Sequence, residues 1–431
     1  MPHTFDSRRD FLKTSLAVGG LTAIGDVLAD EPKKTSPNEK LNVAVIGVAG
    51  QGNFHLGGVG HENMVALCDV DQSHLEKAKA RFPGAKGYTD FREMLASHSN
   101  LDAVVVSTPD HTHAVAAAAA MRLGKHVYCE KPLTHTVSET RVLRSLAKEK
   151  KLVTQLGTQI HAGENYRNVV DVVQSGAIGK VNRVHVYFDG RPQVFKKADP
   201  KEPPKGLAYD LWLGPLEPSP YIPEQGHFHW RYWWKFGNGV LGDFGCHYMD
   251  LAFWALDLGA PKSVSSTATK DHDGVNDVPG KQKVDYVFGG KDGDIHFTWW
   301  HGGDMPDEAA KFKMSRAVLF IGDQGMLAAD YGHYKLLPEE KFAKYQVKRT
   351  IAKSIGHHKE WLNAIPTGGP TTCNFEYSGN LTESVLLGNA ALRGAPGKTL
   401  AWDAASVKFS GEGADEANRF IQHTYRSGWS L

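Results

Sequence analysis

Apolar runs and helical stretches alternate along the chain from about residue 41 to residue 157. Short runs rich in Val, Ile, Leu and Ala are typical of strands, and they lie at residues 41–47, 63–69, 101–107, 125–130 and 151–157. Helical periodicity occurs in the intervening segments at residues 71–82, 111–125 and 136–151. Strands that alternate with helices predict a Rossmann-like, doubly wound parallel sheet covered by helices on both faces.

The pattern changes after about residue 160, where longer alternating strands follow one helical segment at residues 163–176. Further strands are predicted at residues 181–190, 263–269, 283–290, 294–300, 316–322, 325–330 and 333–338. Helical patterns return at residues 357–365 and 378–394. Gly-rich turns separate several of these strands, so we expect a large, mainly antiparallel open sheet. The predicted fold class is therefore α/β followed by α+β.

Residues 193–238, here called the aromatic excursion, are rich in Pro, Gly and aromatic residues and show no regular pattern. Long ordered loops are usually functional. The whole pattern predicts three parts: a signal and linker at residues 1–38, a first domain at residues 39–160 and a second domain at residues 161–431.

Composition narrows the classes of partner. Lys and Arg total 49 against 48 Asp and Glu, and no basic stripe stands out, which argues against nucleic acid and anionic membranes as main partners. The 41% hydrophobic content supports a sizeable core. None of the four cysteines forms a CxxC pair, and we expect free thiols at Cys68, Cys129, Cys246 and Cys373.

The N-terminus has the features of an export signal. The segment Ser7–Lys13 reads S-R-R-D-F-L-K, which resembles the twin-arginine pattern, and a weakly apolar run follows to about Ala29. That run is too short and too rich in Gly to span a membrane, and Val27–Ala29 offers small residues for cleavage. We therefore expect the twin-arginine export machinery as a partner and a periplasmic or otherwise exported location.

A glycine-rich turn after the first strand predicts a dinucleotide site. Such turns let the backbone approach a pyrophosphate at the start of a helix. Asp69 ends the second strand about twenty residues on, where an acid that binds the ribose belongs, and its charge favours NAD over NADP. Ala49 departs from G-x-G-x-x-G at the second glycine. The predicted contacts in the turn are Gly47, Ala49, Gly50, Gln51 and Gly52.

Two further strand ends belong to the same sheet edge. The first carries Ser107, Thr108 and Pro109, and the second carries Glu130 and Lys131, which we expect to line the cofactor site. A Lys beside a nicotinamide cation would have a lowered pKa and could hydrogen-bond a substrate hydroxyl. A surface Lys paired with Glu130 is the alternative.

Two histidines follow the first of these strand ends. His111 and His113 are interpreted as solvated residues at the start of a helix, with His113 also a candidate near the cofactor.

A third group of residues, GVLGDFGCHYMD, places Asp243 four residues before His247. If a helix begins near Asp243, both share a face, and the carboxylate could fix the tautomer of an imidazole base. A helix cap at Asp243 and a buried core role for His247 are alternatives. A metal site with Asp250, helped by His227 or His229, is a further alternative. No HExxH-like or Cys-rich pattern supports it, so no metal is predicted.

The glycine-rich turn, Asp69, S-T-P, E-K-P and D-x-G-x-H-x-x-D occur in the order found in one family. In this respect the chain resembles the Gfo/Idh/MocA oxidoreductases, the glucose–fructose oxidoreductase and inositol dehydrogenase family, over residues 41–400. The resemblance implies a Rossmann domain and a second domain for substrate binding and oligomerisation, and a homo-oligomer. It implies Lys131, Asp243 and His247 as the catalytic set.

The sequence departs from the family at the segment that follows the sixth strand. Residues 157–161 read GTQIH in place of N-x-R-F, so Gln159 or His161 could contact substrate instead. In the aromatic excursion, Trp230, Trp233 and Trp234 could stack on a sugar ring, with Arg231 binding a hydroxyl or carboxylate. Packing in the core or at an interface is the alternative for each Trp.

Taken together, the sequence predicts an NAD(P)-dependent oxidoreductase that acts on a sugar or polyol hydroxyl. Free nicotinamide nucleotide would be scarce outside the cytoplasm, so we expect tightly bound NAD(H) that is regenerated on the protein. One alternative is an NAD-dependent glycoside hydrolase or lyase that oxidises its sugar transiently. Another is a non-catalytic exported sugar-binding protein, which retention of Lys131, Asp243 and His247 argues against.

Overall fold

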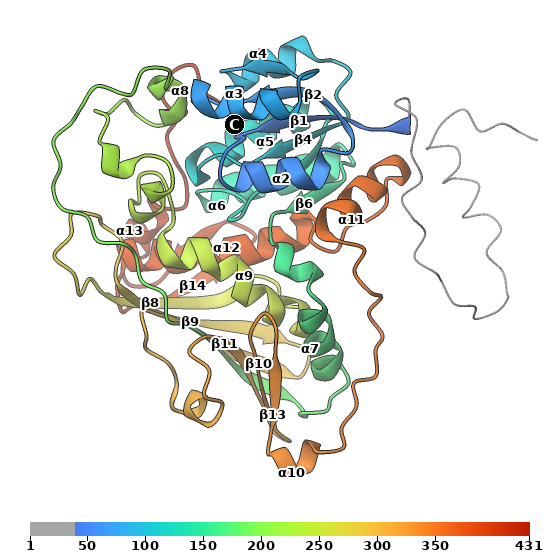
Figure 1. Cartoon of the computed structure of the whole chain (residues 1–431). Helices are drawn as coiled ribbons and strands as arrows, with labels where there is room; N and C mark the ends of the chain where they lie inside the picture. The colour runs from blue at the N-terminus through green and yellow to red at the C-terminus, as the bar shows by residue number, and fades with distance from the viewer. Residues whose placement is uncertain (1–38) are drawn as a thin grey trace, which may run out of the picture.

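The computed structural model describes residues 39–431 and contains two large β-sheets (Figure 1). The first sheet has six parallel strands in the order β3-β2-β1-β4-β5-β6. Its strands are β1 (Asn42–Ile46), β2 (Asn63–Cys68), β3 (Lys86–Tyr88), β4 (Ala103–Val106), β5 (His126–Cys129) and β6 (Thr154–Leu156). The order reverses at β1 and β4, as in doubly wound dinucleotide-binding sheets. The predicted Rossmann fold is confirmed.

Helices cover both faces of this sheet, and β4 is fully buried, as its continuous apolar run predicts. The helices are α2 (Gln51–Val59), α3 (Gln72–Arg81), α4 (Phe91–Ser97), α5 (Asp110–Arg122) and α6 (Val137–Glu149). Asp71 caps α3 by accepting a hydrogen bond from the backbone N–H of Ser73. Thr136 and Glu139 form a capping box at the start of α6.

The second sheet has nine strands in the order β13-β12-β11-β7-β10-β9-β8-β14-β15. Only β7 and β10 pair in parallel within it. Its strands are β7 (Val181–Phe188), β8 (Pro261–Thr269), β9 (Lys281–Gly290), β10 (Gly293–His301), β11 (Ala317–Gly322), β12 (Met326–Ala329), β13 (Tyr334–Leu337), β14 (Thr399–Asp403) and β15 (Lys408–Ser410). The predicted mainly antiparallel sheet is confirmed, although the sequence pattern did not predict β14 and β15.

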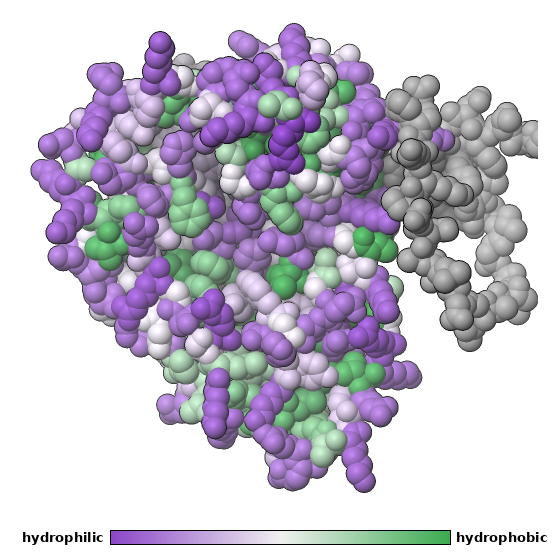
Figure 2. Space-filling model, in the orientation of Figure 1, coloured by the Kyte–Doolittle hydropathy of each residue, from purple (hydrophilic) through white to green (hydrophobic). Residues whose placement is uncertain are grey.

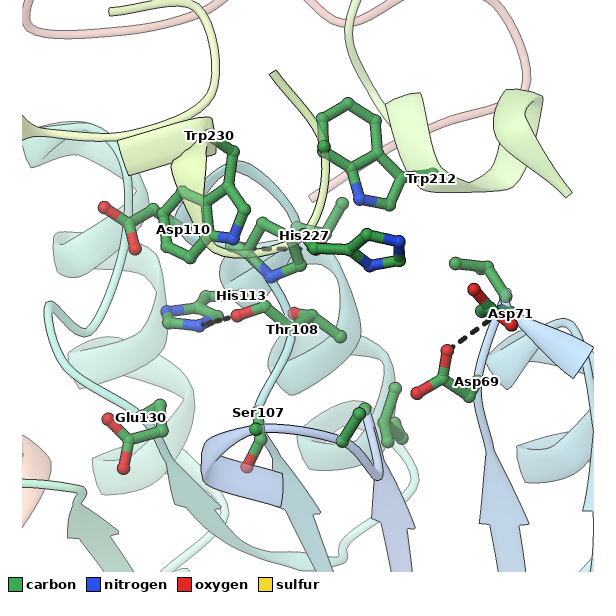
Figure 3. Close-up of a pocket in the computed structure, with 18 of the residues that line it drawn as sticks. Asp69, Asp71, Ser107, Thr108, Asp110, His113, Glu130, Trp212, His227 and Trp230 are labelled. Atoms are coloured by element: carbon green, nitrogen blue, oxygen red, sulfur yellow. Dashed lines mark hydrogen bonds between the residues drawn. The ribbon is translucent and has the colours of Figure 1, made fainter. Parts of the chain in front are cut away.

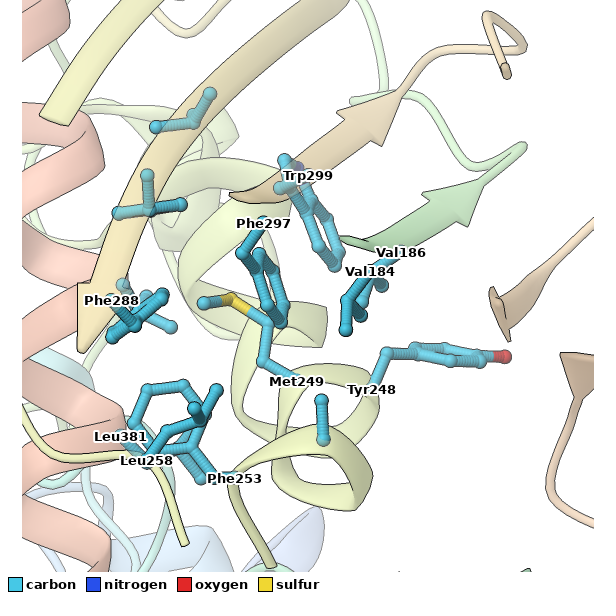
Figure 4. Close-up of a cluster of buried hydrophobic side chains, with 14 of the residues drawn as sticks. Val184, Val186, Tyr248, Met249, Phe253, Leu258, Phe288, Phe297, Trp299 and Leu381 are labelled. Carbon is cyan, nitrogen blue, oxygen red and sulfur yellow. The ribbon is translucent and has the colours of Figure 1, made fainter. Parts of the chain in front are cut away.

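Three helices pack with this sheet around the largest apolar core. They are α7 (Glu164–Gln174), α9 (Gly239–Leu256) and α12 (Phe375–Gly394). In β9, Tyr286 and Phe288 are buried at alternate positions, which is the period of two that a covered face requires. Figure 4 shows Met249 and Phe253 of α9 among Phe288 and Phe297 of the sheet. The sheet therefore forms the support on which α9 presents its residues.

The aromatic excursion contains only short helical turns, in agreement with the irregular pattern of its sequence. These are α8 (Tyr209–Leu213) and the 3₁₀ turns η3 (Pro223–Gln225) and η4 (His229–Tyr232). Phe195, Trp233 and Phe236 belong to a small aromatic core of its own. This core gives an irregular segment a fixed shape.

The chain returns to the first sheet late in the sequence through α11 (His357–Ala364). Trp361 of α11 is fully buried in a cluster with Val45, Val105 and Tyr128 of the first sheet. Its indole N–H donates a hydrogen bond to the backbone carbonyl of Val153 at 3.2 Å. The predicted boundary at residue 160 thus separates the strands of the two sheets. It does not separate the helices that pack on them, because α11 comes from beyond residue 160 and packs on the first sheet. The remaining elements are η2 (Gln159–Ala162), η5 (Asp307–Lys311), α10 (Glu339–Phe342), η6 (Ile365–Thr367) and α13 (Ala414–Asn418).

Within residues 39–431, no helix combines the length and apolar character needed to cross a membrane. Hydrophilic residues cover most of the face shown in Figure 2, with apolar residues in scattered groups. The four cysteines are buried and form no disulfide in this described part of the chain, so the predicted free thiols are confirmed. The predicted signal and linker at residues 1–38 lie outside the described residues.

We expect Trp361→Ala to lower the free energy of unfolding by about 3–5 kcal/mol, because it empties a buried site and removes an indole hydrogen bond. Chemical denaturation monitored by circular dichroism measures the change. Lys359→Ala, an exposed position on the same helix, serves as the matched control. Equal stability of the two variants would contradict the packing role of Trp361.

Candidate functional site

A cavity of about 660 Å³ lies at the carboxyl edge of the first sheet, between the strand ends, the aromatic excursion and α9 (Figure 3). The predicted site residues that line it are Gly47, Ala49, Gly50, Gln51, Asp69, Ser107, Thr108, Pro109, His113, Glu130, Lys131, Arg231, Asp243 and His247. Four others do not line it: Gly52, Gln159, His161 and Trp233. The structure therefore brings together residues that are up to 200 positions apart.

The glycines of the first turn are required by close backbone contacts. A Cβ on Gly47, whose φ is +80°, would lie 2.6 Å from the carbonyl oxygen of Ser107. A Cβ on Gly52 would lie 1.9 Å from the carbonyl oxygen of Gly47, so this glycine shapes the turn without lining the cavity. Gly50 caps α2 without a side chain, and a helix N-terminus favours phosphate. The turn is therefore a glycine cradle: Gly47 and Gly52 allow its close backbone packing, and a side chain at Gly50 would project into open space.

Asp69 is held at the end of β2 by backbone donors. Its carboxylate accepts hydrogen bonds from the N–H of Val48 at 3.0 Å and from the N–H of Asp71 at 2.9 Å. The Ser107 and Thr108 hydroxyl oxygens are buried at the same edge without a hydrogen-bond partner. Unpartnered polar groups in a cavity indicate a polar ligand. With the glycine cradle, these residues fit a dinucleotide.

His113 joins the two strand-end turns. Its ring nitrogens lie 2.8 Å from the carbonyl oxygen of Pro132 and 2.7 Å from that of Thr108. His111 contacts the carbonyl oxygens of Trp212 and Phe236. Both rings are about 1% exposed, so the prediction that they are solvated is wrong. The first turn of α5 is covered by the aromatic excursion, and this cover was not visible in the local sequence pattern.

Glu130 and Lys131 are buried and bind different partners. The carboxylate of Glu130 accepts a hydrogen bond from Nε2 of His55 at 2.8 Å. Burial raises the pKa of Glu130, but His55 and Lys131 lower it more, to about 2. The alternative of a surface lysine paired with Glu130 is therefore wrong, because Lys131 pairs with Asp243 instead.

Lys131 reaches across the cavity to α9. Its ammonium group forms an ion pair with the carboxylate of Asp243 and donates to the backbone carbonyl of Asp243 at 2.8 Å. Arg231 contacts the same carboxylate at 3.2 Å. Burial lowers the pKa of Lys131, but Asp243 and Glu130 raise it above its ordinary value. The protein groups around Lys131 therefore raise its pKa, whereas a nicotinamide cation beside it would act in the opposite direction.

His247 lines the cavity one turn of α9 beyond Asp243 but has a different environment. Burial, followed by the charge of Lys131, lowers the pKa of His247 to about 4, so the ring is neutral at pH 7. Its Nδ1 is buried without a hydrogen-bond partner. The carboxylate of Asp243 is engaged by Lys131 and Arg231, so the predicted Asp243–His247 hydrogen bond is not supported. The helix also begins at Gly239 rather than near Asp243.

Three predicted substrate contacts lie elsewhere. Gln159 and His161 are in the 3₁₀ turn η2, and His161 packs on Trp254 with ring centroids 4.0 Å apart. Nδ1 of His161 also lies 2.9 Å from the carboxylate of Asp250. Trp233 faces Phe195 in the core of the aromatic excursion. A local pattern does not specify which way such short turns point, so these placements were wrong.

The alternative metal site does not form as the sequence suggested. Within residues 39–431, the groups of His, Cys, Asp and Glu that are close enough to share an ion contain neither Asp243 nor His247. Asp250 belongs instead to a buried group with His161. His227 lies beside His74, with ring centroids 5.3 Å apart.

Several residues at the cavity were missed by the sequence analysis. Asp110, at the start of α5, is 3% exposed and accepts a hydrogen bond from the side chain of Asn238 at 3.1 Å. Burial raises the pKa of Asp110 to about 7, although Arg231 and Lys131 oppose the shift. Its position directly after S-T-P was a usable signal. Trp212 and Trp429 also line the cavity, and no local signal identifies Trp429.

Comparison with known proteins agrees with this geometry. A family model described as oxidoreductase family, NAD-binding Rossmann fold, matches residues 41–158. The model of the same family's C-terminal alpha/beta domain matches residues 163–305. Together the two matches cover more than half of the chain. A twin-arginine translocation signal model matches residues 7–25.

Individual relatives are similar over part of their length. Inositol 2-dehydrogenase of Salmonella typhimurium is 28% identical over 34% of this chain and 45% of its own. Levoglucosan dehydrogenase of Pseudarthrobacter phenanthrenivorans is 26% identical over 47% of this chain and 45% of its own. The chain spans less than half of the length of both of these relatives.

Solved structures show the same fold. GenD2 from gentamicin A biosynthesis, solved in complex with NAD, superimposes with a TM-score of 0.61 at 19% identity. The match covers 87% of this chain and 100% of that chain.

Asp110→Asn should change how stability depends on pH. A carboxyl whose folded pKa lies near 7 binds its proton more tightly in the folded state, so the wild type loses stability as pH rises from about 4 to 7. Asn cannot ionise, and its stability relative to wild type should rise by roughly 2–4 kcal/mol between pH 5 and pH 8. Urea denaturation at both pH values measures this, with the exposed Asp292→Asn as control. A pH-independent difference would contradict the assignment.

Proposed function

The chain belongs to the Gfo/Idh/MocA oxidoreductase family, and on this basis we propose that it is an NAD-dependent oxidoreductase acting on a sugar or polyol hydroxyl. One observation carries the proposal. A single cavity contains both the glycine cradle at Gly47 and the buried group formed by Lys131, Asp243 and His247. A dinucleotide held in that cradle would extend toward these side chains.

The residues that would hold the cofactor are those of the first-sheet edge. Gly47 allows the turn to pack against Ser107, Gly50 leaves open space for a pyrophosphate beside the start of α2, and Ser107 and Thr108 offer unpartnered hydroxyl groups. The negative charge of Asp69 suits the ribose hydroxyls of NAD and repels the additional phosphate of NADP. When bound, a nicotinamide dinucleotide accepts hydride from an alcohol carbon or returns it to a carbonyl carbon.

The proton chemistry is divided between Lys131 and His247. Lys131 is cationic because Asp243 compensates its charge, so its ammonium group donates a hydrogen bond to the substrate oxygen and stabilises negative charge there. His247 is neutral, and a neutral imidazole accepts a hydroxyl proton. Asp243 holds Lys131 and Arg231 in place. This division differs from the sequence prediction, in which Asp243 oriented His247.

Aromatic side chains support a carbohydrate substrate. Trp212 and Trp230 line the cavity, and flat indole faces stack on the apolar faces of sugar rings. Arg231 is held between Phe228 and Trp230, with its guanidinium carbon 4.4 Å and 4.2 Å from the two ring centroids. These two ring contacts hold the guanidinium group of Arg231, a hydrogen-bond donor, beside Asp243. The levoglucosan and inositol relatives are consistent with such a substrate.

We also propose that the protein is exported through the twin-arginine route to the periplasm and retains its cofactor there. The signal match supports export, and two ties across the cavity support retention. In the first tie, the N–H of Gln72 donates to the carbonyl of Gly206 at 2.9 Å, and the N–H of Ala208 donates to the carbonyl of Val70 at 2.9 Å. Assembly as a homo-oligomer stays a prediction.

The second tie is the C-terminal tail. Arg426 donates hydrogen bonds to the carbonyl oxygens of Gly214 and Asp210, both at 2.7 Å, and pairs with the carboxylate of Asp210. Trp429 lines the cavity, and the guanidinium of Arg92 lies 4.3 Å from its ring centroid. The tail therefore connects the aromatic excursion, through Arg426, to α4, through Trp429, and it covers one end of the cavity.

Replacement of Lys131 tests the proposed reaction. Lys131→Met should lower kcat/KM for the responsive sugar or polyol by about 10²- to 10⁴-fold, because the oxygen loses its charged donor. A panel of sugars and polyols, followed by absorbance of the reduced nicotinamide at 340 nm, identifies the substrate first. The matched control is Lys262→Met, a surface lysine paired with Asp294. Sugar binding unchanged in Lys131→Met, with no redox signal in either protein, would instead indicate a binding module.

Release of the cofactor tests retention. Arg426→Ala should increase the rate at which NAD(H) leaves the purified protein by about tenfold or more, which corresponds to ~1.4 kcal/mol. The rate is measured by nucleotide assay during dialysis. Arg419→Ala, which removes a tail arginine paired only with Glu416 on the surface, should leave the rate unchanged. Free exchange of NAD(H) in the wild type would contradict retention.

A further inference from the structure

Three side chains with metal-binding atoms meet at the rim of the cavity, away from Lys131 and Asp243. Asp71 and His74 come from the start of α3, and His227 comes from the aromatic excursion. One ligand atom from each lies within 4.8 Å of the others. Figure 3 shows the ring of His227 extending toward Asp71 and Asp69. The cluster therefore bridges two segments that are more than 150 positions apart.

Local structure holds the carboxylate of Asp71 and the backbone on both sides of the cluster. The carboxylate of Asp71 accepts a hydrogen bond from the N–H of Ser73 at 2.8 Å, which fixes it at the start of the helix. His227 has a φ of 45°, a conformation that non-glycine residues seldom adopt. The β-bridge between Asp71 and Leu207 brings the aromatic excursion to the same point. Pre-arranged ligands lose little entropy when they bind an ion.

We propose that Asp71, His74 and His227 form a zinc site that fastens the aromatic excursion to the first domain. Two imidazoles and one carboxylate, with water in a fourth position, are a ligand set that Zn²⁺ accepts in tetrahedral geometry. The three ligands join α3 to the aromatic excursion and leave the fourth position open to water, and the site takes no part in the redox step. It does not depend on the proposed function, because zinc binding is read out without turnover.

A neighbouring carboxylate supplies two things that such a site needs: negative charge, and a partner for the second ring nitrogen of a metal-binding histidine. Asp69 adds a second carboxylate, 3.8 Å from Nδ1 of His74. Metal-bound histidines commonly direct their second ring nitrogen toward a carboxylate, which fixes the tautomer and strengthens the ligand. Two negative charges from Asp69 and Asp71 also offset a divalent cation. His74 and His227 are accessible at the rim, so an ion has a path of entry.

A second cluster in the described residues lacks these properties. His161, Asp250 and Cys373 are also close enough to share an ion, but all three are buried. The carboxylate of Asp250 already accepts a hydrogen bond from the hydroxyl of Tyr377 at 2.7 Å and lies 2.9 Å from Nδ1 of His161. Burial also raises the pKa of the Cys373 thiol, which opposes the thiolate that zinc requires. The rim cluster is therefore the better zinc site, because it is accessible to an ion and needs no thiolate.

Zinc titration of the full chain tests the proposal. The protein is treated with a chelator, desalted, and titrated with Zn²⁺ by isothermal calorimetry. We expect one equivalent to bind, and His227→Ala and His74→Ala to weaken binding by about tenfold or more. His229→Ala, a histidine of the same segment outside the cluster, should bind like the wild type.

Two results would overturn the proposal. One is wild-type binding no stronger than that of the His74→Ala/His227→Ala double variant. The other is reduced NAD binding in His227→Ala with unchanged zinc affinity, which would make the cluster an adenosine contact instead. Failure of the oxidoreductase proposal would leave the zinc titration unaffected, so the two outcomes are distinguishable.

Discussion

The ion pair between Lys131, which is buried, and Asp243, which is half-buried, is the contact on which the rest of the site depends. It joins the end of β5 in the first domain to α9, which is supported by the second sheet, across 112 positions of the chain. Neither charge would be stable at this depth alone, because an unpaired buried charge costs several kcal/mol. The pair therefore fixes both side chains at the domain boundary. It also explains why Lys131 is cationic and why Asp243 is unavailable to His247.

The charges around this pair are close to balanced, but they are unevenly placed in the cavity. Lys131 and Arg231 share the carboxylate of Asp243, while Glu130 is engaged by His55. Asp110 adds only part of a negative charge near neutral pH, because burial raises its pKa to about 7. The two positive charges of Lys131 and Arg231 therefore match the two negative charges of Asp243 and Glu130, but both cations lie together at the carboxylate of Asp243. A fixed ammonium group of this kind can stabilise negative charge on an oxygen atom without rearrangement of the protein.

Much of the fold was predictable because buried positions recur at a regular spacing in helices and strands. Apolar residues recur in the sequence at the same spacing. The strands of the first sheet read as apolar runs since helices cover both faces. In the second sheet, β9 alternates since one of its faces packs on the helices around α9. The short β3, with the sequence Lys-Gly-Tyr, carries too little pattern to identify. The start of α9 was misplaced because its first turn, Gly-Val-Leu-Gly, has poor helix propensity and forms through packing.

The site was predictable where the fold itself aligns residues, and not elsewhere. Strand ends of a parallel sheet share one edge, so Asp69, Ser107 and Lys131 were placed correctly beside one cavity. His161 was misplaced because it lies in a short turn whose direction depends on α9. Trp429 was missed because only tertiary packing brings the tail to the cavity.

The aromatic excursion and the C-terminal tail enclose the cavity that contains the dinucleotide turn. This enclosure bears on why an export signal and a dinucleotide turn occur in one chain. The cradle at Gly47 forms within the first domain, whereas Leu207 and Trp429, which help to enclose the cavity, come from later in the chain. Under the proposed function, a cofactor bound to the first domain would be enclosed once the aromatic excursion and the tail have folded over it. Opening that enclosure means breaking the hydrogen bonds of Arg426 and the backbone tie at Gln72. Transport in the folded state preserves these contacts, whereas transport of an unfolded chain would lose both the contacts and the cofactor. An export route for folded proteins and a nucleotide site are therefore compatible in one chain.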